Sequence, residues 1–410
     1  MAVVWIVNHY AQAPSGPGGT RHHSLARHLQ SHGWQPLILA GSCEHNTGRQ
    51  RLLPGEDQRF ERCDGVDFFW LRVIGEPVVG GWRRFVTMLM FALTLLRPTT
   101  TRALPRPDVV IGSTVHPFAA LAACLLARRY SVDFVFEVRD LWPSTLVSMG
   151  AIRAGGLLDR GLGWLERLLA HRAARIVVLM SGGIEYFQAL GIPRSRLLWL
   201  PNGAEVSVNP PVALRADPQP FQLFYCGAHG PANALGTVLD AMAELESRGF
   251  SSDQLILRLI GDGSSKAELQ HYAHRLGLDS VIFEPAVPKK LLQERMAEAD
   301  AFVVAMQPLP ELYRYGISFN KLFDYFLSSR PIVSASCAAH DPVQAADAGI
   351  VVPAGDPRAL ADAIQRLLQL PYEERQRLGA NGRAYLEAHH SYPLLAERLA
   401  AELDDLLPFQ

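Results

Sequence analysis

The segment PNGAEVSVNPPVALRADPQP, residues 201–220, divides the sequence into two halves of similar pattern. It is rich in proline and polar residues, which is typical of a linker. On each side of it, short apolar runs alternate with longer helical patterns. Repeated β-α alternation predicts a parallel, doubly wound sheet. We therefore expect two Rossmann-like α/β domains, residues 1–203 and 204–388, on either side of a hinge.

The expected strands are short, apolar runs, as in sheets that are covered on both faces. In the first domain they are Val3–Val7, Pro36–Ala40, Phe68–Val73, Val109–Gly112, Phe134–Val138, Ile176–Leu179 and Leu197–Leu200. In the second they are Phe221–Cys226, Leu255–Ile260, Val281–Phe283, Ala301–Ala305 and Ile332–Ala335. A last helix, from about residue 389 to 410, is expected to pack back on the first domain. Ligands bind at the carboxyl ends of such strands, so we expect a site in a cleft between the domains.

Composition limits the class of protein. The 410 residues are 49% hydrophobic and 19% charged, which is enough apolar material for two cores. The formal charge of −1 gives no overall field that attracts nucleic acid. Five scattered cysteines without a C-x-x-C pair are typical of buried thiols in a reducing compartment. With no recognisable secretory signal and no apolar run long enough to span a membrane, we expect a cytoplasmic protein.

A glycine-rich loop is the first candidate for binding an anion. It lies in HYAQAPSGPGGTRHHSLARHL, residues 9–29, directly after the first expected strand. Gly18 and Gly19 let the backbone approach a diphosphate at the N-terminus of the following helix. The segment matches neither the dinucleotide nor the P-loop fingerprint. A plain β-α turn that needs flexible residues is the alternative.

Two further segments place lysines at helix starts. In LIGDGSSKAELQHYAHRLGL, residues 259–278, Lys266 lies in a first turn, where a cation is disfavoured unless an anion binds beside it. In YRYGISFNKLFDYFLSSRPIVSAS, residues 313–336, Asn320, Lys321 and Asp324 share one side of a short helix. Lysine can meet a phosphate, and aspartate can accept from sugar or ribose hydroxyls. Solvated surface residues are the alternative in both segments.

A charged pair follows another expected strand, in EVRDLWP, residues 137–143. Asp140 could accept the proton of an acceptor hydroxyl, and Arg139 could bind an acceptor phosphate. The alternative is a local ion pair that fixes the loop.

The glycine-rich loop and the two lysine-containing segments, in this order and with PNG at the hinge, resemble retaining glycosyltransferases of family 4, which have the GT-B fold. The resemblance extends over nearly the whole chain. Four segments are similar to bacterial O-antigen and capsule enzymes that transfer N-acetylated 6-deoxyaminosugars such as N-acetyl-fucosamine. They are NHYAQAPSGPGGTRHHSLARHL, EVRDLWP, YCGAHGPANALGTVLDAM and YRYGISFNKLFDYFLSSRPIV. The resemblance implies transfer from a UDP-sugar to a lipid-linked or oligosaccharide acceptor.

The resemblance also implies roles for individual residues. Gly18, Gly19 and Lys266 would contact the donor diphosphate, and Asp324 would hold the ribose hydroxyls. The base would lie against the loop that contains Ala286, Val287 and Pro288. Three positions where many members carry charge are Ala228, Asn233 and Gly316 in this sequence. Lys321, Ser318 and the backbone of residues 316–318 are expected to compensate.

No metal or cofactor is expected, because the sequence has no Asp-x-Asp triplet and no His-x-x-x-His with a glutamate base. The neighbouring His22 and His23 would point about 100° apart on a helix, so we expect solvent-facing or capping roles for them. Lys266, Lys321 and helix N-termini would then neutralise the leaving group.

The segment Trp82–Arg97, WRRFVTMLMFALTLLR, has an apolar body with arginines at both ends. It is too short to span a bilayer, and it could lie in a membrane interface or form a buried helix. With the lipid-linked acceptor that the resemblance implies, it predicts peripheral contact with the inner face of the cytoplasmic membrane.

Three alternatives to a glycosyltransferase remain at this point. They are a GT-B-like UDP-sugar 2-epimerase, a two-lobed sugar-binding protein, and a non-catalytic subunit that depends on a partner.

Overall fold

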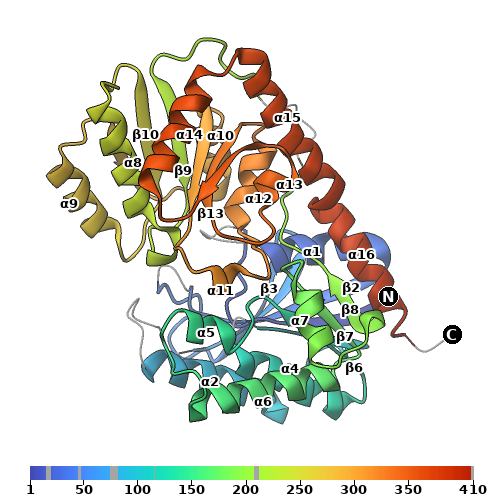
Figure 1. Ribbon diagram of the computed structural model, residues 1–410. Coiled ribbons are helices and arrows are strands. Elements are labelled where there is room, and N and C mark those ends of the chain that lie inside the picture. The colour runs from blue at the N-terminus through green and yellow to red at the C-terminus, as the bar shows by residue number, and fades with distance from the viewer. Residues whose placement is uncertain (15–19, 45–47, 74–81, 115, 207–211, 408–410) are drawn as a thin grey trace. The chain divides into compact units, whose positions relative to one another are not determined.

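The computed structural model describes residues 1–14, 20–44, 48–73, 82–114, 116–206 and 212–407 (Figure 1). The chain forms two compact units. The first combines Met1–Pro201 with Tyr392–Gln410, and the second is Asn202–Ser391. Each unit is built on one sheet with helices on both faces.

The first unit contains an eight-stranded sheet in the order β3-β4-β2-β1-β5-β6-β7-β8. The strands are β1 Ala2–Val7, β2 Trp34–Gly41, β3 Gln58–Cys63, β4 Val66–Leu71, β5 Val109–Ser113, β6 Asp133–Val138, β7 Arg175–Val178 and β8 Leu197–Trp199. Only β3 runs antiparallel to its neighbour among the described strands of this sheet. The strand order reverses between β1 and β5, so the carboxyl ends of these two strands flank a topological switch point.

Helices cover both faces of this sheet. They are α1 Arg21–Leu29, α2 Trp82–Leu96, α3 Pro98–Thr101, α4 Pro117–Tyr130, α5 Ser144–Ser148, α6 Leu157–Arg172, α7 Gly183–Ala189 and α16 Tyr392–Asp404. On one face α1 and α16 pack together with strand residues such as Ile6 and Ile38 in one buried cluster. Trp34 Nε1 donates to Asp404 Oδ1 at 2.9 Å, which ties α16 to β2. On the other face α4 packs against β5 and β6, with α2 and α6 on either side of it.

The second unit contains a six-stranded sheet in the order β11-β10-β9-β12-β13-β14, in which every pairing is parallel. Its strands are β9 Phe221–Cys226, β10 Leu255–Ile260, β11 Val281–Glu284, β12 Ala301–Ala305, β13 Ile332–Ser336 and β14 Gly349–Pro353. Its helices are α8 Leu235–Ser247, α9 Lys266–Leu276, α10 Lys289–Met296, α11 Pro310–Tyr313, α12 Asn320–Leu327, α13 Pro342–Ala345, α14 Pro357–Gln369 and α15 Tyr372–His389. The strand order reverses between β9 and β12, which defines the switch point of this sheet.

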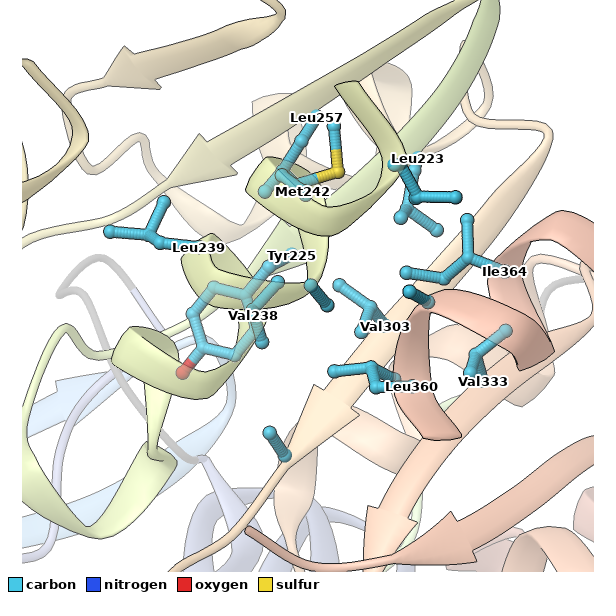
Figure 2. Packing of buried hydrophobic residues seen from close by; sticks show 14 of the residues in the cluster. Leu223, Tyr225, Val238, Leu239, Met242, Leu257, Val303, Val333, Leu360 and Ile364 are labelled. Atoms are coloured by element: carbon cyan, nitrogen blue, oxygen red, sulfur yellow. The ribbon is translucent and has the colours of Figure 1, made fainter. Parts of the chain in front are cut away.

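Figure 2 shows the core on one face of the second sheet. Leu223, Tyr225 and Val303 point from the strands toward Val238 on α8 and Leu360 on α14. The opposite face is covered by α12 and α15, which pack with Phe302 and Val304. Burial on both faces explains why these strands read as nearly continuous apolar runs.

The alternation of apolar runs and helical patterns predicted the two sheets correctly, because every expected strand is present. The strand ends differ from the predicted ones by no more than about two residues, which is the usual uncertainty of element boundaries. Two edge strands were missed. In β3, QRFERC, exposed and half-buried side chains alternate, so the apolar signal of a covered strand is absent. In β14 all residues are half-buried or exposed.

Candidate functional site

The ammonium of Lys321 lies at the switch point of the second sheet. Its Nζ donates to Tyr225 Oη at 2.9 Å and to Asn233 Oδ1. It also lies 4.7 Å from the centroid of the Tyr225 ring. Tyr225 belongs to β9 and Asn233 follows it by eight positions, while Lys321 is in the first turn of α12. Two segments that are distant in sequence, residues 225–233 and the start of α12, therefore meet where ligands bind in folds of this kind.

The charge of Lys321 has no acidic partner among the described residues. Its neighbours are a hydroxyl, an amide oxygen and aromatic rings. Burial lowers the pKa of Lys321 to about 7. A buried ammonium group that has lost its hydration and has no carboxylate partner is stabilised by an anion that binds beside it. This lysine is therefore prepared for an anionic ligand.

Lys266 is held differently. Its Nζ donates to the carbonyl oxygens of Gly261 and Glu284, at 2.7 and 2.8 Å, and to Asp262 Oδ1 at 2.8 Å. The hydrogen bond from Lys266 also lowers the pKa of Asp262. The position at the start of α9 is as the sequence indicated, but the structure supplies an acidic partner four residues earlier. Lys266 thereby fastens together the loops that follow β10 and β11.

Two glycines bring the loops after β9 and β10 into backbone contact. Gly261 has φ +152°, and a Cβ there would lie 1.9 Å from the carbonyl oxygen of Gly227. A Cβ on Gly263 would lie 2.4 Å from the carbonyl oxygen of His229. The loops are joined by hydrogen bonds from His229 N to Asp262 O and from Ser265 N to His229 O, both 2.9 Å. Only glycine permits this approach, which places the start of α9 beside the β9 loop.

His229 is a site residue that the sequence analysis missed. Its side chain is fully buried, and neither ring nitrogen has a hydrogen-bond partner in the described part of the chain. Burial, followed by the charges of Lys266 and Lys321, lowers the pKa of His229 to about 4. The imidazole is therefore neutral, and it is close enough to Lys266 and Lys321 for both charges to act on it. A histidine between two glycines directly after a buried strand was the available signal in GAHGPAN.

The other expected donor contacts lie on or near α12. Asn320 and Asp324 are half-buried on this helix, and Asp324 follows Lys321 by three residues. Ser318 Oγ accepts from Asn202 N at 2.9 Å, and Asn202 Nδ2 donates to Ser318 O at 2.6 Å, so this serine also anchors the PNG segment. Val287 is half-buried and packs against the core under α12. Gly18 and Gly19 lie outside the described residues.

A buried polar network lies at the ligand end of the first sheet. His22 Nε2 and Glu137 Oε2 are 2.6 Å apart, and Arg21 Nε donates to Glu137 Oε1 at 2.9 Å. A hydrogen bond of 2.8 Å joins His22 Nδ1 to Asn8 Nδ2. Burial opposes the ionisation of Glu137, but the charges of His22 and Arg21 outweigh it and hold its pKa well below its usual value.

This network corrects the expectation for His22 and His23. Both side chains are buried, and His23 forms a hydrogen bond of 3.2 Å with the carbonyl oxygen of Cys63. Solvent-facing roles are therefore wrong. The helix pattern alone does not reveal that the first turn of α1 lies under the ends of β1 and β6 and is satisfied there.

A second histidine pair marks the switch point between β1 and β5. His9 Nδ1 and His116 Nε2 are 2.9 Å apart. His116 Nδ1 accepts from Ala119 N at 3.2 Å, so Nε2 carries the proton and donates to His9. The His9 ring is stacked on Tyr10 and on Phe91 of α2, each with a centroid distance of 4.4 Å. Two histidines that each follow a buried strand could have been found in the sequence.

Arg139 and Asp140 follow β6 directly. Arg139 N donates to Thr114 Oγ1 at 3.0 Å, which fixes the start of the loop. No ion pair joins the two side chains in the described structure, so the local pair considered above is not formed. Asp140 is a solvent-exposed residue, yet the protein packed around it raises its pKa by desolvation, and the nearby charge of Arg139 opposes that rise.

Within the described residues, no group of three or more histidine, cysteine, aspartate or glutamate side chains is arranged to hold a metal ion. No described helix is both long and apolar enough to cross a bilayer.

Comparison with known proteins agrees with this architecture. Residues 17–203 match the family described as "Glycosyl transferase 4-like domain", and residues 220–370 match "Glycosyl transferases group 1". Sucrose-phosphate synthase from Thermosynechococcus elongatus superposes with a TM-score of 0.74 and 18% identity, covering 99% of each chain. HepE of Anabaena, solved with UDP and glucose, superposes with a TM-score of 0.65 and 13% identity over 99% of this chain and 100% of that one.

A sequence relative is WcaI of Escherichia coli K12, whose name assigns it to colanic acid biosynthesis as a glycosyl transferase. It is 22% identical over 265 residues, which are 61% of this chain and 63% of the relative's length. The two sheets have the GT-B fold, as in sucrose-phosphate synthase and OtsA. The two matched families together span most of the chain, which therefore belongs to the family 4 glycosyltransferases and is an enzyme of that class.

Proposed function

We propose that the enzyme transfers a sugar from a UDP-sugar, with retention of configuration, to a lipid-linked or oligosaccharide acceptor in surface polysaccharide synthesis. The unneutralised ammonium of Lys321 at the switch point of the second sheet is the observation that carries the donor half of this proposal. HepE, solved with UDP-glucose, supports UDP as the nucleotide. The name of WcaI supports a polysaccharide product.

The donor would be held mainly by the second unit. The diphosphate would lie beside Lys321, with Lys266 and the start of α9 adding positive potential. Asp324 would accept from the ribose hydroxyls, and Asn320 and Ser318 would add polar contacts. The base would lie against Val287. Gly18 and Gly19 would add backbone contacts to the diphosphate, as the resemblance to family 4 implies.

In the reaction, the bond between the anomeric carbon and the diphosphate oxygen breaks, and a glycosidic bond forms to the acceptor hydroxyl. Asp140 would take the proton of that hydroxyl, and its raised pKa suits this role. Arg139 would bind an acceptor phosphate. The charge that develops on the leaving UDP would be met by Lys321 and Lys266, so we propose that no metal is needed.

The sugar is proposed to be an N-acetylated hexosamine or 6-deoxyaminosugar. Where many members of family 4 carry a glutamate, this chain has Gly316, a buried residue with φ +92°. The carboxylate that would bond a sugar hydroxyl is thus absent at this position, which suits a donor with a different, substituted sugar.

The test is thermal stabilisation of the whole chain by UDP-, GDP-, dTDP- and ADP-sugars. A ligand that binds only the folded state raises Tm, and the rise grows with the ratio of ligand concentration to Kd. Stabilisation by UDP-sugars alone is expected. Stabilisation by a different nucleotide would refute UDP as the donor nucleotide, and none at all would refute the donor site.

We further propose that the enzyme works in the cytoplasm at the inner face of the membrane, where a lipid-linked acceptor would be met. Helix α2, which occupies the segment Trp82–Leu96, is the sequence feature behind this location.

A further inference from the structure

Large apolar side chains are exposed on one face of the first unit. On α2 they occur at a spacing of four residues, and Phe85, Leu89 and Leu93 are 50%, 38% and 54% exposed. A spacing of four keeps side chains on one side of a helix. From its sequence this segment could form a buried or an interfacial helix, and in the structure its helix is only partly buried. One side of α2 is buried, and the other is apolar but uncovered.

Helix α6 continues this exposed apolar face. Leu157 and Leu158 at its start are 90% and 64% exposed, and Trp164 at its middle is 64% exposed. Between Leu157 and Trp164 lies Gly161, where an added Cβ would meet nothing within 4 Å. Helix α4 packs against both α2 and α6, and its Leu125 is exposed as well (Figure 1). The three helices thus form one surface layer, and we call its exposed side the α2–α6 face.

Arginines border the apolar residues. Arg160 and Arg167 are exposed on α6 and flank Trp164. Arg128 and Arg129 are exposed at the end of α4, and Arg172 at the end of α6. The acidic residues in these three helices are Asp159 and the buried Glu166. The face is therefore basic in a chain whose formal charge is −1. Scattered exposed leucines are ordinary, but a basic apolar layer with an exposed tryptophan is not.

The buried side of α2 is firmly attached. Phe91 is fully buried and stacks on His9, which forms a hydrogen bond with His116 at the switch point of the first sheet. Leu95 is fully buried too. The exposed residues of α2 are thus presented by a helix with a packed core side, and the same helix contacts the ligand end of the sheet.

We propose that the α2–α6 face docks the enzyme on an anionic lipid bilayer. Leucine and phenylalanine side chains would enter the upper acyl region, Trp164 would sit at the headgroup level, and the arginines would meet lipid phosphates while their stems cover apolar surface. This inference deepens the proposed function, since it names the surface on which a lipid-linked acceptor is met. It extends the expected contact from α2 to α4 and α6.

The test is co-sedimentation of the whole chain with vesicles of phosphatidylcholine and phosphatidylglycerol, compared with phosphatidylcholine alone. The wild type is expected to bind the anionic vesicles and to be released by high salt. Leu157→Ser/Trp164→Ser and, separately, Leu89→Ser/Leu93→Ser are expected to lower partitioning at least about tenfold, because each removes exposed apolar surface that would enter the bilayer. The matched control, Leu53→Ser/Leu276→Ser, removes two leucines that are exposed elsewhere and is expected to bind as the wild type does.

Failure of the wild type to bind anionic vesicles at low salt would overturn the inference, as would variants that bind like the wild type. A dimer in sedimentation velocity that Leu157→Ser/Trp164→Ser converts to a monomer, without vesicle binding, would assign the face to a second copy instead. Stabilisation by a UDP-sugar is measured on the same preparation. If the nucleotide binds and vesicles do not, only the docking inference fails; the reverse outcome overturns only the proposed donor site.

Discussion

Replacing Lys321 by methionine removes the ammonium while keeping a side chain of similar length. The hydrogen bonds from Lys321 show that the charge is held in place but not neutralised. A hydrogen bond to a charged group is worth about 1.5–3 kcal/mol. Loss of such a contact to the diphosphate should therefore raise the Kd for a UDP-sugar about 10- to 150-fold. Because the variant no longer buries an unpaired charge, its Tm should stay equal or rise.

The same lysine makes donor binding depend on pH. With the pKa of Lys321 at about 7 in the free protein, the ammonium form prevails below that pH and declines above it. A bound diphosphate favours the ammonium, so binding takes up a proton. The Kd for UDP-N-acetylglucosamine should therefore rise about tenfold between about pH 6 and pH 8, by linkage. The diphosphate diester of this ligand does not titrate in that range.

Isothermal titration calorimetry of the full chain measures both effects. Lys321→Arg is the matched control, because a guanidinium stays charged throughout and should give a Kd that is nearly independent of pH. Lys321→Met should bind weakly at every pH. A wild-type Kd that stays constant across this range, or a methionine variant within about threefold of the wild type, would refute the assignment of Lys321 to the diphosphate.

Three further substitutions, and a fourth that serves as a control, test the structure around the sites. Glu137→Gln leaves the buried Arg21 without its carboxylate, so urea titration should show a loss of about 3–5 kcal/mol in the free energy of unfolding. Because the pKa of Glu137 is held well below its usual value, that loss should persist at neutral pH and shrink only in strong acid. A variant as stable as the wild type would contradict the network. Glu166 is buried, and burial raises its pKa to about 7. Its ionisation should therefore lower the free energy of unfolding as the pH rises from about 4.5 to about 7. The loss should be at most about 1.4 kcal/mol for each pH unit. Glu166→Gln should remove that slope in thermal unfolding, and a slope that persists would count against the assignment. Gly261→Ala should lower Tm strongly, because its Cβ would collide with the carbonyl oxygen of Gly227. The control Gly277→Ala, at φ +70° with open space around it, should lower the free energy of unfolding by only about 1 kcal/mol. Equal effects of the two substitutions would show that the loop contact is not as described.

The sheets were predictable because strands that are buried on both faces appear in the sequence as short, continuous apolar runs. Strands such as Val109–Ser113 and Ala301–Ala305 are entirely buried, and their residues are apolar or small. Edge strand β3 has no such run, since every second side chain is exposed. Its pairing with β4 rests on a turn with Asp64 and Gly65 at positive φ, which the apolar pattern does not register.

The candidate site was predictable in its residue types but not in its pairings. Lys321 was recognisable from its place at a helix start, yet its partners are 96 and 88 residues away in sequence. Which of two lysines keeps a free charge depends on tertiary contacts, since Asp262 meets Lys266 and no carboxylate meets Lys321 in the described structure. The burial of His22 and His229 is likewise set by packing between strand ends, which a single helix or turn does not reveal.

Hydrogen exchange of the full chain, with and without UDP-N-acetylglucosamine, tests the central claim most directly. Binding at the switch point of the second sheet should slow exchange in residues 226–235, 261–270 and 316–325, where the β9 loop, the start of α9 and α12 meet. Lys321→Met should remove this protection at the same ligand concentration. Protection that spares all three segments, or that survives unchanged in Lys321→Met, would contradict the account of how this glycosyltransferase holds its donor.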